Sequence, residues 1–275
     1  MSARCLVIGC GSIGSRRARI LAEMGHEVEV CDPLRPVRAA KFGRLVDLDE
    51  VLMRRPGALP DVAFICTPAA THVEIAGQCV MANVPTFVEK PLSLTMDGID
   101  DLISEAEARG VVTMGACNMR WAYREAVGAV ADDLALCIAR PLSQWRPGAR
   151  EAYAPGGLVL EAAIHEMDLA HQILGDIEDV YSMGSHEAAV INLRHARGEC
   201  RIYASWAEGE PCSRWLAAGP DRFYPDTSDE MYRLEMQHFL DCVAENRPTC
   251  NPLRSAAHVL EWAIKAQEQI RMVGV

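Results

Sequence analysis

The sequence lacks the features that mark membrane and secreted proteins. No apolar run approaches the roughly 18 residues of a membrane-spanning helix, and no signal peptide is recognisable. Its 11 cysteines are scattered, odd in number and without a CxxC pair, which disfavours a disulfide framework and a zinc site. We therefore expect a cytoplasmic protein with small buried cysteines and no bound metal.

A surplus of positive charge is also missing. Lys and Arg total 27 against 38 Asp and Glu, so the formal net charge is −11 and the pI is about 5.2. Because nucleic-acid backbones and anionic membranes bind basic surfaces, neither is an expected partner. Half of the 275 residues are hydrophobic, which is enough for one large domain or two ordinary ones. A small molecule is the expected partner.

The most informative motif lies near the amino terminus, where an apolar run at 4–8 is followed by the glycine pattern GxGxxG and a helix-like segment. This is the arrangement of a dinucleotide-binding fingerprint. Gly9 permits the tight turn, Gly11 lets the backbone approach a pyrophosphate, and Gly14 lets the helix pack closely on the strand. The N–H groups at the helix start then face the phosphates. The expected cofactor contacts in this loop are Gly9, Gly11, Ser12, Ile13 and Gly14.

Asp32 ends the second predicted strand and bears on the choice of cofactor. A carboxylate there accepts hydrogen bonds from an adenosine 2′-hydroxyl and repels a 2′-phosphate, so NAD is preferred over NADP. Arg35 and Arg38 follow directly and could meet that phosphate, or they belong to a solvated surface loop. NADP therefore stays open as the second choice.

Strand and helix patterns alternate up to about residue 118, which predicts a doubly wound parallel sheet with helices on both faces. The expected strands are 4–8, 27–31, 44–46, 62–66, 86–88 and 111–114, and the expected helices are 16–21, 48–54, 72–81 and 99–108. We predict a Rossmann-type nucleotide-binding domain over residues 1–118.

After residue 118 the pattern changes to a second α/β domain, residues 119–275, whose final helix can pack back on the first domain. The expected helices are 122–130, 158–174, 231–244 and 255–272, and the expected strands are 136–144, 180–183, 188–193, 200–206 and 213–217. Because the last four strands follow one another directly, they are expected to be antiparallel. Residues 147–157 are rich in Gly and Pro and predict a loop.

Glu89, Lys90 and Pro91 follow a predicted parallel strand, at the edge where ligands bind in open α/β sheets. A lysine there can donate to a substrate hydroxyl and stabilise alkoxide character as a hydride leaves. Standing alone, Lys90 would be better explained as a surface lysine before a turn. The bond between Lys90 and Pro91 can be cis, a form tolerated before proline.

Glu161 and His165 stand four residues apart on a predicted helix and share one of its faces. A carboxylate beside an imidazole fixes the tautomer and raises the basicity of the ring, as a general base requires. The same spacing is also common in polar pairs without a catalytic role. It could supply two metal ligands, but His171 turns away and offers no third.

Thr67 and Pro68 end another predicted parallel strand and would line the ribose side of a bound cofactor. His72 follows at a helix start. It is either a further cofactor contact or an ordinary residue of the first helical turn.

Taken in order, these motifs resemble the Gfo/Idh/MocA family of sugar and cyclitol oxidoreductases, over nearly the whole chain. They are GCGSIG at 9–14, CTPAATH at 66–72, EKPLS at 89–93, CNMR at 117–120, GG at 156–157 followed by HEMD at 165–168, and the helical region 232–252. The resemblance implies a Rossmann domain and an α/β domain whose open sheet backs the active site and often forms an oligomer contact. Lys90 and His165 match the family's catalytic lysine and histidine.

The resemblance also implies that Asn118 lies near substrate or nicotinamide, that Glu89 and Lys90 border the cofactor, and that Asp168 of HEMD belongs to the substrate site. Two departures stand out. Glu161 occupies a position where the family usually has Asp, so its carboxylate reaches one methylene further. The second domain, with its mostly antiparallel sheet, is shorter than usual.

Residues 144–147 resemble a branch of the family associated with modified sugars of surface glycans. Trp145 could stack on a sugar or pack at a domain interface, and Arg146 could bind a carboxylate or a nucleotide diphosphate.

The expected activity is hydride transfer between NAD(P) and a hydroxyl or keto carbon of a sugar, nucleotide sugar or cyclitol. His165 would take or return the hydroxyl proton, Lys90 would polarise the oxygen, and Glu161 would orient His165. Two alternatives stay open. One is a dinucleotide-binding sensor without turnover, and the other is a glycosidase that uses bound NAD for transient oxidation, a chemistry found among relatives of the family.

Overall fold

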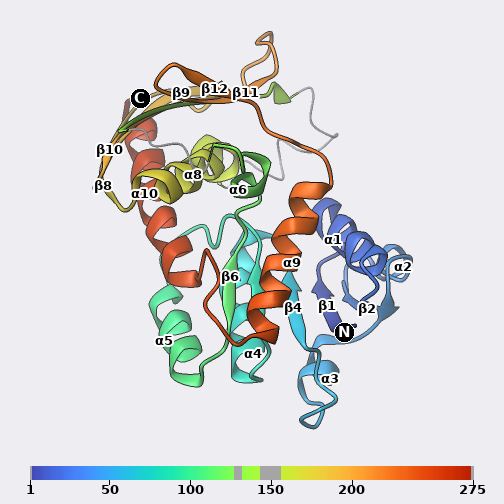
Figure 1. Ribbon diagram of the computed structural model, residues 1–275. Coiled ribbons are helices and arrows are strands. Elements are labelled where there is room, and N and C mark those ends of the chain that lie inside the picture. The colour runs from blue at the N-terminus through green and yellow to red at the C-terminus, as the bar shows by residue number, and fades with distance from the viewer. Residues whose placement is uncertain (1, 127–131, 143–155, 274–275) are drawn as a thin grey trace. The chain divides into compact units, whose positions relative to one another are not determined.

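The computed structural model describes residues 2–126, 132–142 and 156–273. The chain divides into two compact units, each built from two stretches of sequence (Figure 1). Unit 1 comprises Met1–Ala116 and Tyr232–Ala256, and unit 2 comprises Cys117–Met231 and Ala257–Val275. A late segment of the chain thus returns to complete the first unit.

Unit 1 contains a six-stranded parallel sheet, as predicted, in the order β3-β2-β1-β4-β5-β6. Its strands are β1 (Arg4–Ile8), β2 (Glu27–Cys31), β3 (Arg44–Leu45), β4 (Val62–Ile65), β5 (Thr86–Val88) and β6 (Thr113–Gly115). Every residue of β4 and β5 is buried, because helices cover both faces of the sheet, and this explains their continuous apolar runs.

The helices of unit 1 alternate with these strands along the chain. They are α1 (Ser12–Glu23), α2 (Pro36–Ala39), α3 (Leu48–Leu52), the short η1 (Ala69–Thr71), α4 (His72–Met81), α5 (Ile99–Arg109) and the later α9 (Glu230–Ala244). Phe239 of α9 packs on Phe64 and Phe87 of the sheet, with ring centroids 5.6 and 5.7 Å away. Helix α9 therefore belongs to the core of unit 1 despite its late position in the sequence.

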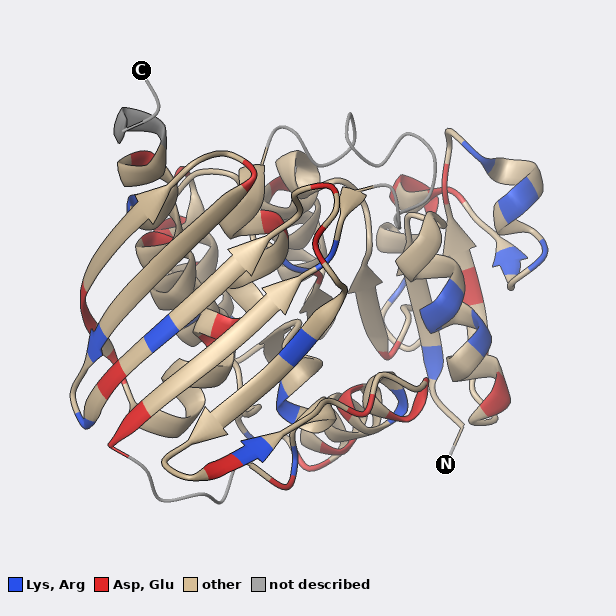
Figure 2. Cartoon of the chain, turned by 90° about the horizontal axis from the view of Figure 1, so that it is seen from above, with Lys and Arg blue, Asp and Glu red and all other residues tan. Residues whose placement is uncertain are grey.

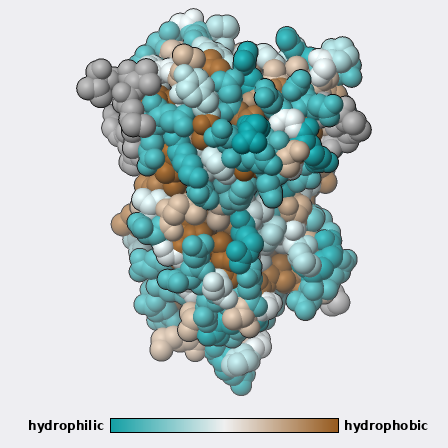
Figure 3. Space-filling model, turned by 90° about the vertical axis from the view of Figure 1, so that its left-hand side faces the viewer, coloured by the Kyte–Doolittle hydropathy of each residue, from teal (hydrophilic) through white to brown (hydrophobic). Residues whose placement is uncertain are grey.

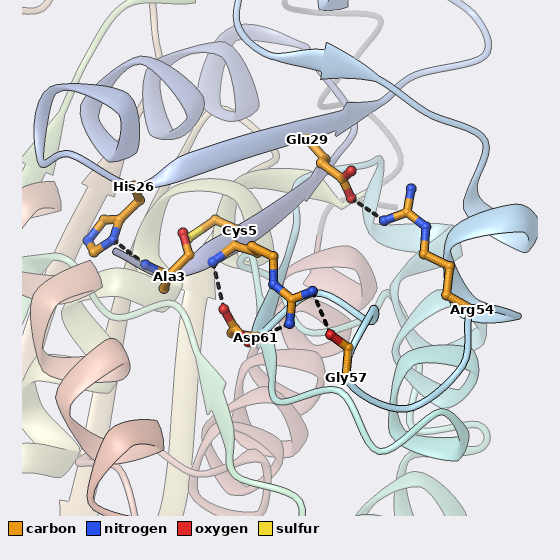
Figure 4. A network of polar contacts seen from close by, with 8 residues as sticks. Ala3, Cys5, His26, Glu29, Arg54, Gly57 and Asp61 are labelled. Carbon is orange, nitrogen blue, oxygen red and sulfur yellow. Dashed lines mark hydrogen bonds and ion pairs between the residues drawn. The ribbon is translucent and has the colours of Figure 1, made fainter. Parts of the chain in front are cut away.

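Polar contacts close the amino ends of the strands in unit 1 (Figure 4). The Arg4 backbone N–H donates to Asp61 Oδ2 (2.7 Å), and its guanidinium donates to Asp61 Oδ1 (3.1 Å) and to the Gly57 carbonyl (3.0 Å). Nearby, the Ala3 N–H donates to His26 Nδ1 (3.1 Å). The contacts of Arg4 are exposed and contribute about 1 kcal/mol each at most. They occupy the edge opposite the carboxyl ends of the strands.

Unit 2 contains a second six-stranded sheet in the order β12-β11-β7-β10-β9-β8. Its strands are β7 (Asp133–Ala139), β8 (Ile177–Gly184), β9 (Ala188–His195), β10 (Gly198–Ser205), β11 (Ser213–Ala218) and β12 (Asp221–Phe223). The sheet is mostly antiparallel, as predicted, and β8, β9 and β10 pair in sequence order.

The last four predicted strands run in alternating directions, as expected, but β10 and β11 are not direct neighbours. Strand β7 lies between β10 and β11, parallel to β10 and antiparallel to β11. Its residues 136–139 are apolar and buried, as suits a central strand. Strand β12 was not predicted.

The helices of unit 2 are α6 (Met119–Ala122), the π-helical turn η3 (Val159–Ala163), α8 (Ile164–Leu174) and α10 (Leu253–Val273), which begins in unit 1. The predicted helix 122–130 is wrong over 123–126, which form turns; residues 127–130 lie outside the described part. The Ala122 carbonyl accepts from the Asp226 N–H (3.0 Å), and Tyr123 leaves helical geometry. The predicted helix 158–174 is divided between η3 and α8.

The sheet of unit 2 has one face packed on helices and one face without a helix among the described residues. Ser182 of β8 donates from its hydroxyl to the Ala266 carbonyl of α10 (2.6 Å). In Figure 2 the strands lie in front of the helices, and most of their ribbon is coloured for residues other than Lys, Arg, Asp and Glu. Tyr181 and Met183 are 61% and 50% exposed.

The surface seen in Figure 3 is largely hydrophilic, with hydrophobic residues scattered among the polar ones. Within the described residues, no helix has the length and apolar character required to cross a membrane.

Candidate active site

The glycine-rich loop joins β1 to α1 as the motif predicts. Gly9 has φ +88°, and a Cβ there would lie 2.8 Å from the Cys66 backbone. A Cβ on Gly14 would lie 1.8 Å from the Gly9 carbonyl oxygen, so the strand and helix meet too closely for any side chain. Beside Gly11 the nearest atom is Arg35 Nη1, 3.6 Å from the Cβ position. The loop therefore leaves an open cradle that fits a dinucleotide pyrophosphate.

Asp32 lies at the end of β2 and is 7% exposed. Its Oδ2 accepts from the Cys10 N–H (2.8 Å), and its Oδ1 accepts from the N–H groups of Leu34 (3.1 Å) and Arg35 (2.9 Å). A carboxylate has about four acceptor positions, so these bonds leave room for one more donor. The contact with a ribose hydroxyl stays a prediction.

Arg35 and Arg38 lie beside the glycine-rich loop. The Arg38 guanidinium donates to Ser15 Oγ (3.2 Å) and to the Gly11 carbonyl (3.4 Å), while Arg35 Nη1 borders Gly11. Both side chains are exposed. Two cations thus stand within reach of the place where the sequence predicts the adenosine end of a cofactor.

His72 bridges two of the loops that end parallel strands. The ring is 1% exposed, with Nδ1 3.0 Å from the Pro91 carbonyl and Nε2 2.9 Å from the Thr67 carbonyl. A neutral imidazole has one N–H and can donate to only one of them. Burial lowers the pKa of His72, although the two carbonyls and Glu89 oppose that shift. A contact with the cofactor stays a prediction for His72, as it does for Thr67 and Pro68.

Lys90 lies just beyond the carboxyl end of β5, where the sequence predicted it. Its side chain is half-buried, and the predicted cis form of the Lys90–Pro91 bond is confirmed. Glu89 is 7% exposed and accepts from the Arg17 guanidinium, with Nε 2.6 Å from Oε1. Sequence reasoning missed Arg17, because its partner Glu89 lies 72 residues away along the chain.

Glu161 and His165 lie on the continuous helical segment formed by η3 and α8. Glu161 is 9% exposed, and His165 is half-buried. A Cβ on Gly156 would lie 2.6 Å from Glu161 Oε1, so the glycine allows the carboxylate to lie against the backbone. Val159 N–H donates to Gln267 Oε1 of α10 (2.9 Å), which secures the π-helical turn. Such turns occur frequently at functional sites.

Asp168 is joined to Arg120 of the CNMR motif by a buried bidentate ion pair. Arg120 Nε donates to Asp168 Oδ2 (2.8 Å), and Nη2 donates to Oδ1 (2.7 Å). Arg120 Nη1 also donates to Gln172 Oε1 (2.5 Å). Asn118, 6% exposed, starts α6 and donates to Met231 Sδ (3.6 Å). A role in substrate binding stays a prediction for both Asn118 and Asp168.

A second, partly buried ion pair holds α8 to the sheet of unit 2. Arg214 Nε of β11 donates to Glu166 Oε1 (2.7 Å), and Glu166 is 1% exposed. Tyr123 lies in the same neighbourhood, and burial raises the pKa of its hydroxyl above its ordinary value. Sequence reasoning missed this pair because Arg214 has no motif around it.

Trp145 and Arg146, the two remaining predicted substrate residues, lie outside the described residues.

One group of side chains in the described part could hold a metal ion, namely His171, Asp176 and His258 of unit 2. The lone pair of His258 Nε2 already accepts from the Ile177 N–H (3.0 Å). A metal at Nε2 would have to displace that hydrogen bond, so the group fits an ion poorly.

The glycine loop predicts opposite effects for two alanine substitutions. Gly11→Ala keeps an allowed φ of −65° and meets only a flexible arginine, so the free energy of unfolding should hardly change. Its methyl group enters the cradle, so the Kd for NAD should rise at least about tenfold. Calorimetric titration and thermal unfolding measure both quantities.

Gly14→Ala serves as the comparison. It should lower the free energy of unfolding by about 3 kcal/mol, since its Cβ would collide with the Gly9 carbonyl. Unchanged NAD affinity in Gly11→Ala would contradict the assignment of Gly11 to the pyrophosphate.

His72 predicts a loss of stability in mild acid. Because its folded-state pKa is lowered, the unfolded chain takes up a proton first as the pH falls through about 6.5. Stability should therefore decrease from pH 7.5 to 5.5, and His72→Gln should reduce that dependence. Urea unfolding of both proteins at the two pH values measures the change, and identical slopes would exclude a contribution from His72.

Residues 3–116 match the family model described as "Oxidoreductase family, NAD-binding Rossmann fold". Myo-inositol 2-dehydrogenase of Thermotoga maritima is 28% identical over 203 residues, which is 65% of this chain and 57% of that protein. The chain thus matches little more than half the length of that relative.

Solved structures share the fold over nearly the whole chain. UDP-N-acetylglucosamine 3-dehydrogenase from Acidithiobacillus ferrooxidans is 20% identical, with a TM-score of 0.83 and 99% of both chains covered. Myo-inositol 2-dehydrogenase from Lactobacillus plantarum is 18% identical, with a TM-score of 0.85 and coverage of 99% and 98%. Residues 3–116 thus match a family of oxidoreductases with an NAD-binding Rossmann fold, and the solved structures show that nearly the whole chain shares the fold of these proteins.

Proposed function

We propose that this protein is an NAD(P)-dependent dehydrogenase or reductase acting on a CH–OH group of a sugar, nucleotide sugar or cyclitol. The observation that carries the proposal is Lys90, a half-buried lysine just beyond the carboxyl end of β5 in an NAD-binding Rossmann domain. The relatives named above include dehydrogenases of an inositol and of a nucleotide sugar, which supports this substrate class.

The cofactor would lie along the carboxyl edge of the sheet of unit 1. The residues proposed to hold it are Gly9, Gly11, Ser12, Ile13, Gly14, Asp32, Thr67, Pro68, His72, Glu89 and Lys90. When bound, NAD supplies a nicotinamide that accepts or returns a hydride. Asp32 favours NAD, since its carboxylate repels a 2′-phosphate, while Arg35 and Arg38 beside the loop weaken that repulsion.

The proton steps are assigned to Lys90, His165 and Glu161. His165 would take the hydroxyl proton as general base or return it as general acid. Lys90 would donate to the same oxygen and stabilise its developing charge. Glu161 would hold the imidazole in the tautomer that accepts the proton.

The substrate is proposed to contact Asn118, Trp145, Arg146 and Asp168. Arg120 would hold Asp168 in place there, because their ion pair is buried and bidentate. We also propose a homo-oligomer through the open face of the sheet of unit 2, where Tyr181 and Met183 are exposed.

The first test is calorimetric titration with NAD and NADP, followed by a screen for NADH formation across sugars, nucleotide sugars and inositols. We expect tighter binding of NAD and stoichiometric NADH from at least one polyol. Retained NAD without net NADH would favour the glycosidase. Binding without any turnover would favour the sensor, and absence of nucleotide binding would overturn the proposal.

Lys90→Met should reduce kcat at least about a thousandfold, because the developing alkoxide loses its donor. The Kd for NAD should change less than about threefold, since Lys90 is one of many proposed cofactor contacts and the glycine loop and Asp32 are untouched. Single-turnover kinetics and titration measure the two quantities separately. Equal losses in both would remove Lys90 from the chemistry and make it a binding residue.

A further inference from the structure

Among the largest fully buried side chains of the described residues, that of Arg17 is the largest and the only one from an arginine. It lies in the first turns of α1, just after the glycine loop, and is 1% exposed. Burying a guanidinium costs several kcal/mol unless its charge and donors are met. The surroundings of Arg17 must therefore supply strong compensation.

Two carboxylates and two aromatic rings compensate the charge, while Nη1 is buried without a hydrogen-bond partner among the described residues. Arg17 contacts Glu89 Oε1 through Nε (2.6 Å) and Nη2 (2.5 Å), and Nη2 also donates to Glu235 Oε2 (2.8 Å). The guanidinium lies over Phe87 at 4.4 Å and over Tyr232 at 5.5 Å from the ring centroids. Arg17 is thus fixed in position and in the orientation of its plane.

Glu89 transmits this fixed geometry to the next residue. While Oε1 is held by Arg17, Oε2 accepts from the backbone N–H of Lys90 (3.2 Å). One carboxylate therefore ties the guanidinium to the backbone from which the Lys90 side chain projects. Glu235 of α9 is 0% exposed and binds Nη2, the same nitrogen that contacts Glu89. All four residues belong to unit 1.

We propose that Arg17 is a positioning residue for Lys90, acting through Glu89 and braced by Glu235. The inference rests on the proposed function, in which Lys90 donates to the reacting oxygen. Its physical basis is the fork of the guanidinium, which fixes two carboxylates in a plane, whereas an ammonium is a point charge on a flexible stem. Arg17→Lys keeps the charge and removes the fork, so it separates geometry from electrostatics.

The small number of lysines makes Lys90 directly observable. The sequence contains three, Lys41, Lys90 and Lys265. Reductive methylation with carbon-13 formaldehyde keeps each amine positively charged and gives one NMR signal per lysine beside the terminal amine. Lys90→Arg assigns the Lys90 signal, while Lys41 and Lys265 serve as references within each sample.

In Arg17→Lys, we expect the Lys90 signal to shift and its titration midpoint to move, with the signals of Lys41 and Lys265 unchanged. Arg19→Lys is the matched control, because Arg19 lies on the same helix and pairs with exposed Glu23. Each of these two substitutions adds a fourth lysine and with it one further signal, and Arg19→Lys should leave the signals of Lys41, Lys90 and Lys265 in place. If Arg17→Lys does not fold, Glu235→Gln replaces it, with Asp241→Asn of the same helix as control.

Kinetics provide the second readout. Arg17→Lys should lower kcat at least about tenfold, because a displaced lysine stabilises the oxygen less well, and should leave the KM for NAD within about twofold. If Arg17 only supported the fold, its substitution would lower the unfolding temperature without lowering kcat at a nearly unchanged KM.

The two proposals fail in different ways. An unmoved Lys90 signal in folded Arg17→Lys, or in Glu235→Gln where that variant is needed, overturns the positioning role, whatever the activity. A wild-type protein that forms no NADH from any polyol overturns the proposed function, while the NMR comparison still tests whether Arg17 sets the surroundings of Lys90.

Discussion

The close approach of α1 to the end of β1 is the constraint on which unit 1 depends. Gly14 lies against the Gly9 carbonyl with no space for a Cβ, so the first turn of α1 is held directly beside the strand. This contact aims the helix N–H groups at the open side of Gly11 and brings Arg17 over Phe87 of β5. A single steric requirement thus links the nucleotide cradle to the loop that carries Lys90.

Several acidic residues of the motifs form ion pairs with arginines. Glu89 of EKP binds Arg17, and Asp168 of HEMD binds Arg120, each buried and each through charge-assisted hydrogen bonds. Glu166, in the same motif as Asp168, binds Arg214. These pairs connect elements distant in sequence, and they hold the segments that present Lys90 and His165. The motifs therefore contain both the proposed catalytic residues and the residues that hold them in place.

The structure of unit 2 differs from the one predicted from its sequence where long-range contacts determine the strand order and the helix boundaries. Strand β7 enters the sheet between β10 and β11, although the chain order gives no sign of this. The single predicted helix at 158–174 becomes a π-helical turn followed by α8, with Gln267 of α10 bonded to its first turn. The helix predicted from Ala122 stops there because the Asp226 N–H takes its carbonyl. In each case a partner far along the chain overrides local propensity.

By itself, the sequence determined the parallel sheet of unit 1, the glycine loop, the position of Asp32 and the placement of Lys90 after β5, because these depend on local periodicity and on glycine's missing side chain. It also placed Glu161 and His165 on one helical segment. Tertiary structure alone decided the partners of Arg17, Arg120 and Arg214, the strand order of the second sheet and the return of α9 to unit 1. The physical reason is that ion pairs and strand neighbours form between residues tens to hundreds of positions apart, where no spacing rule applies.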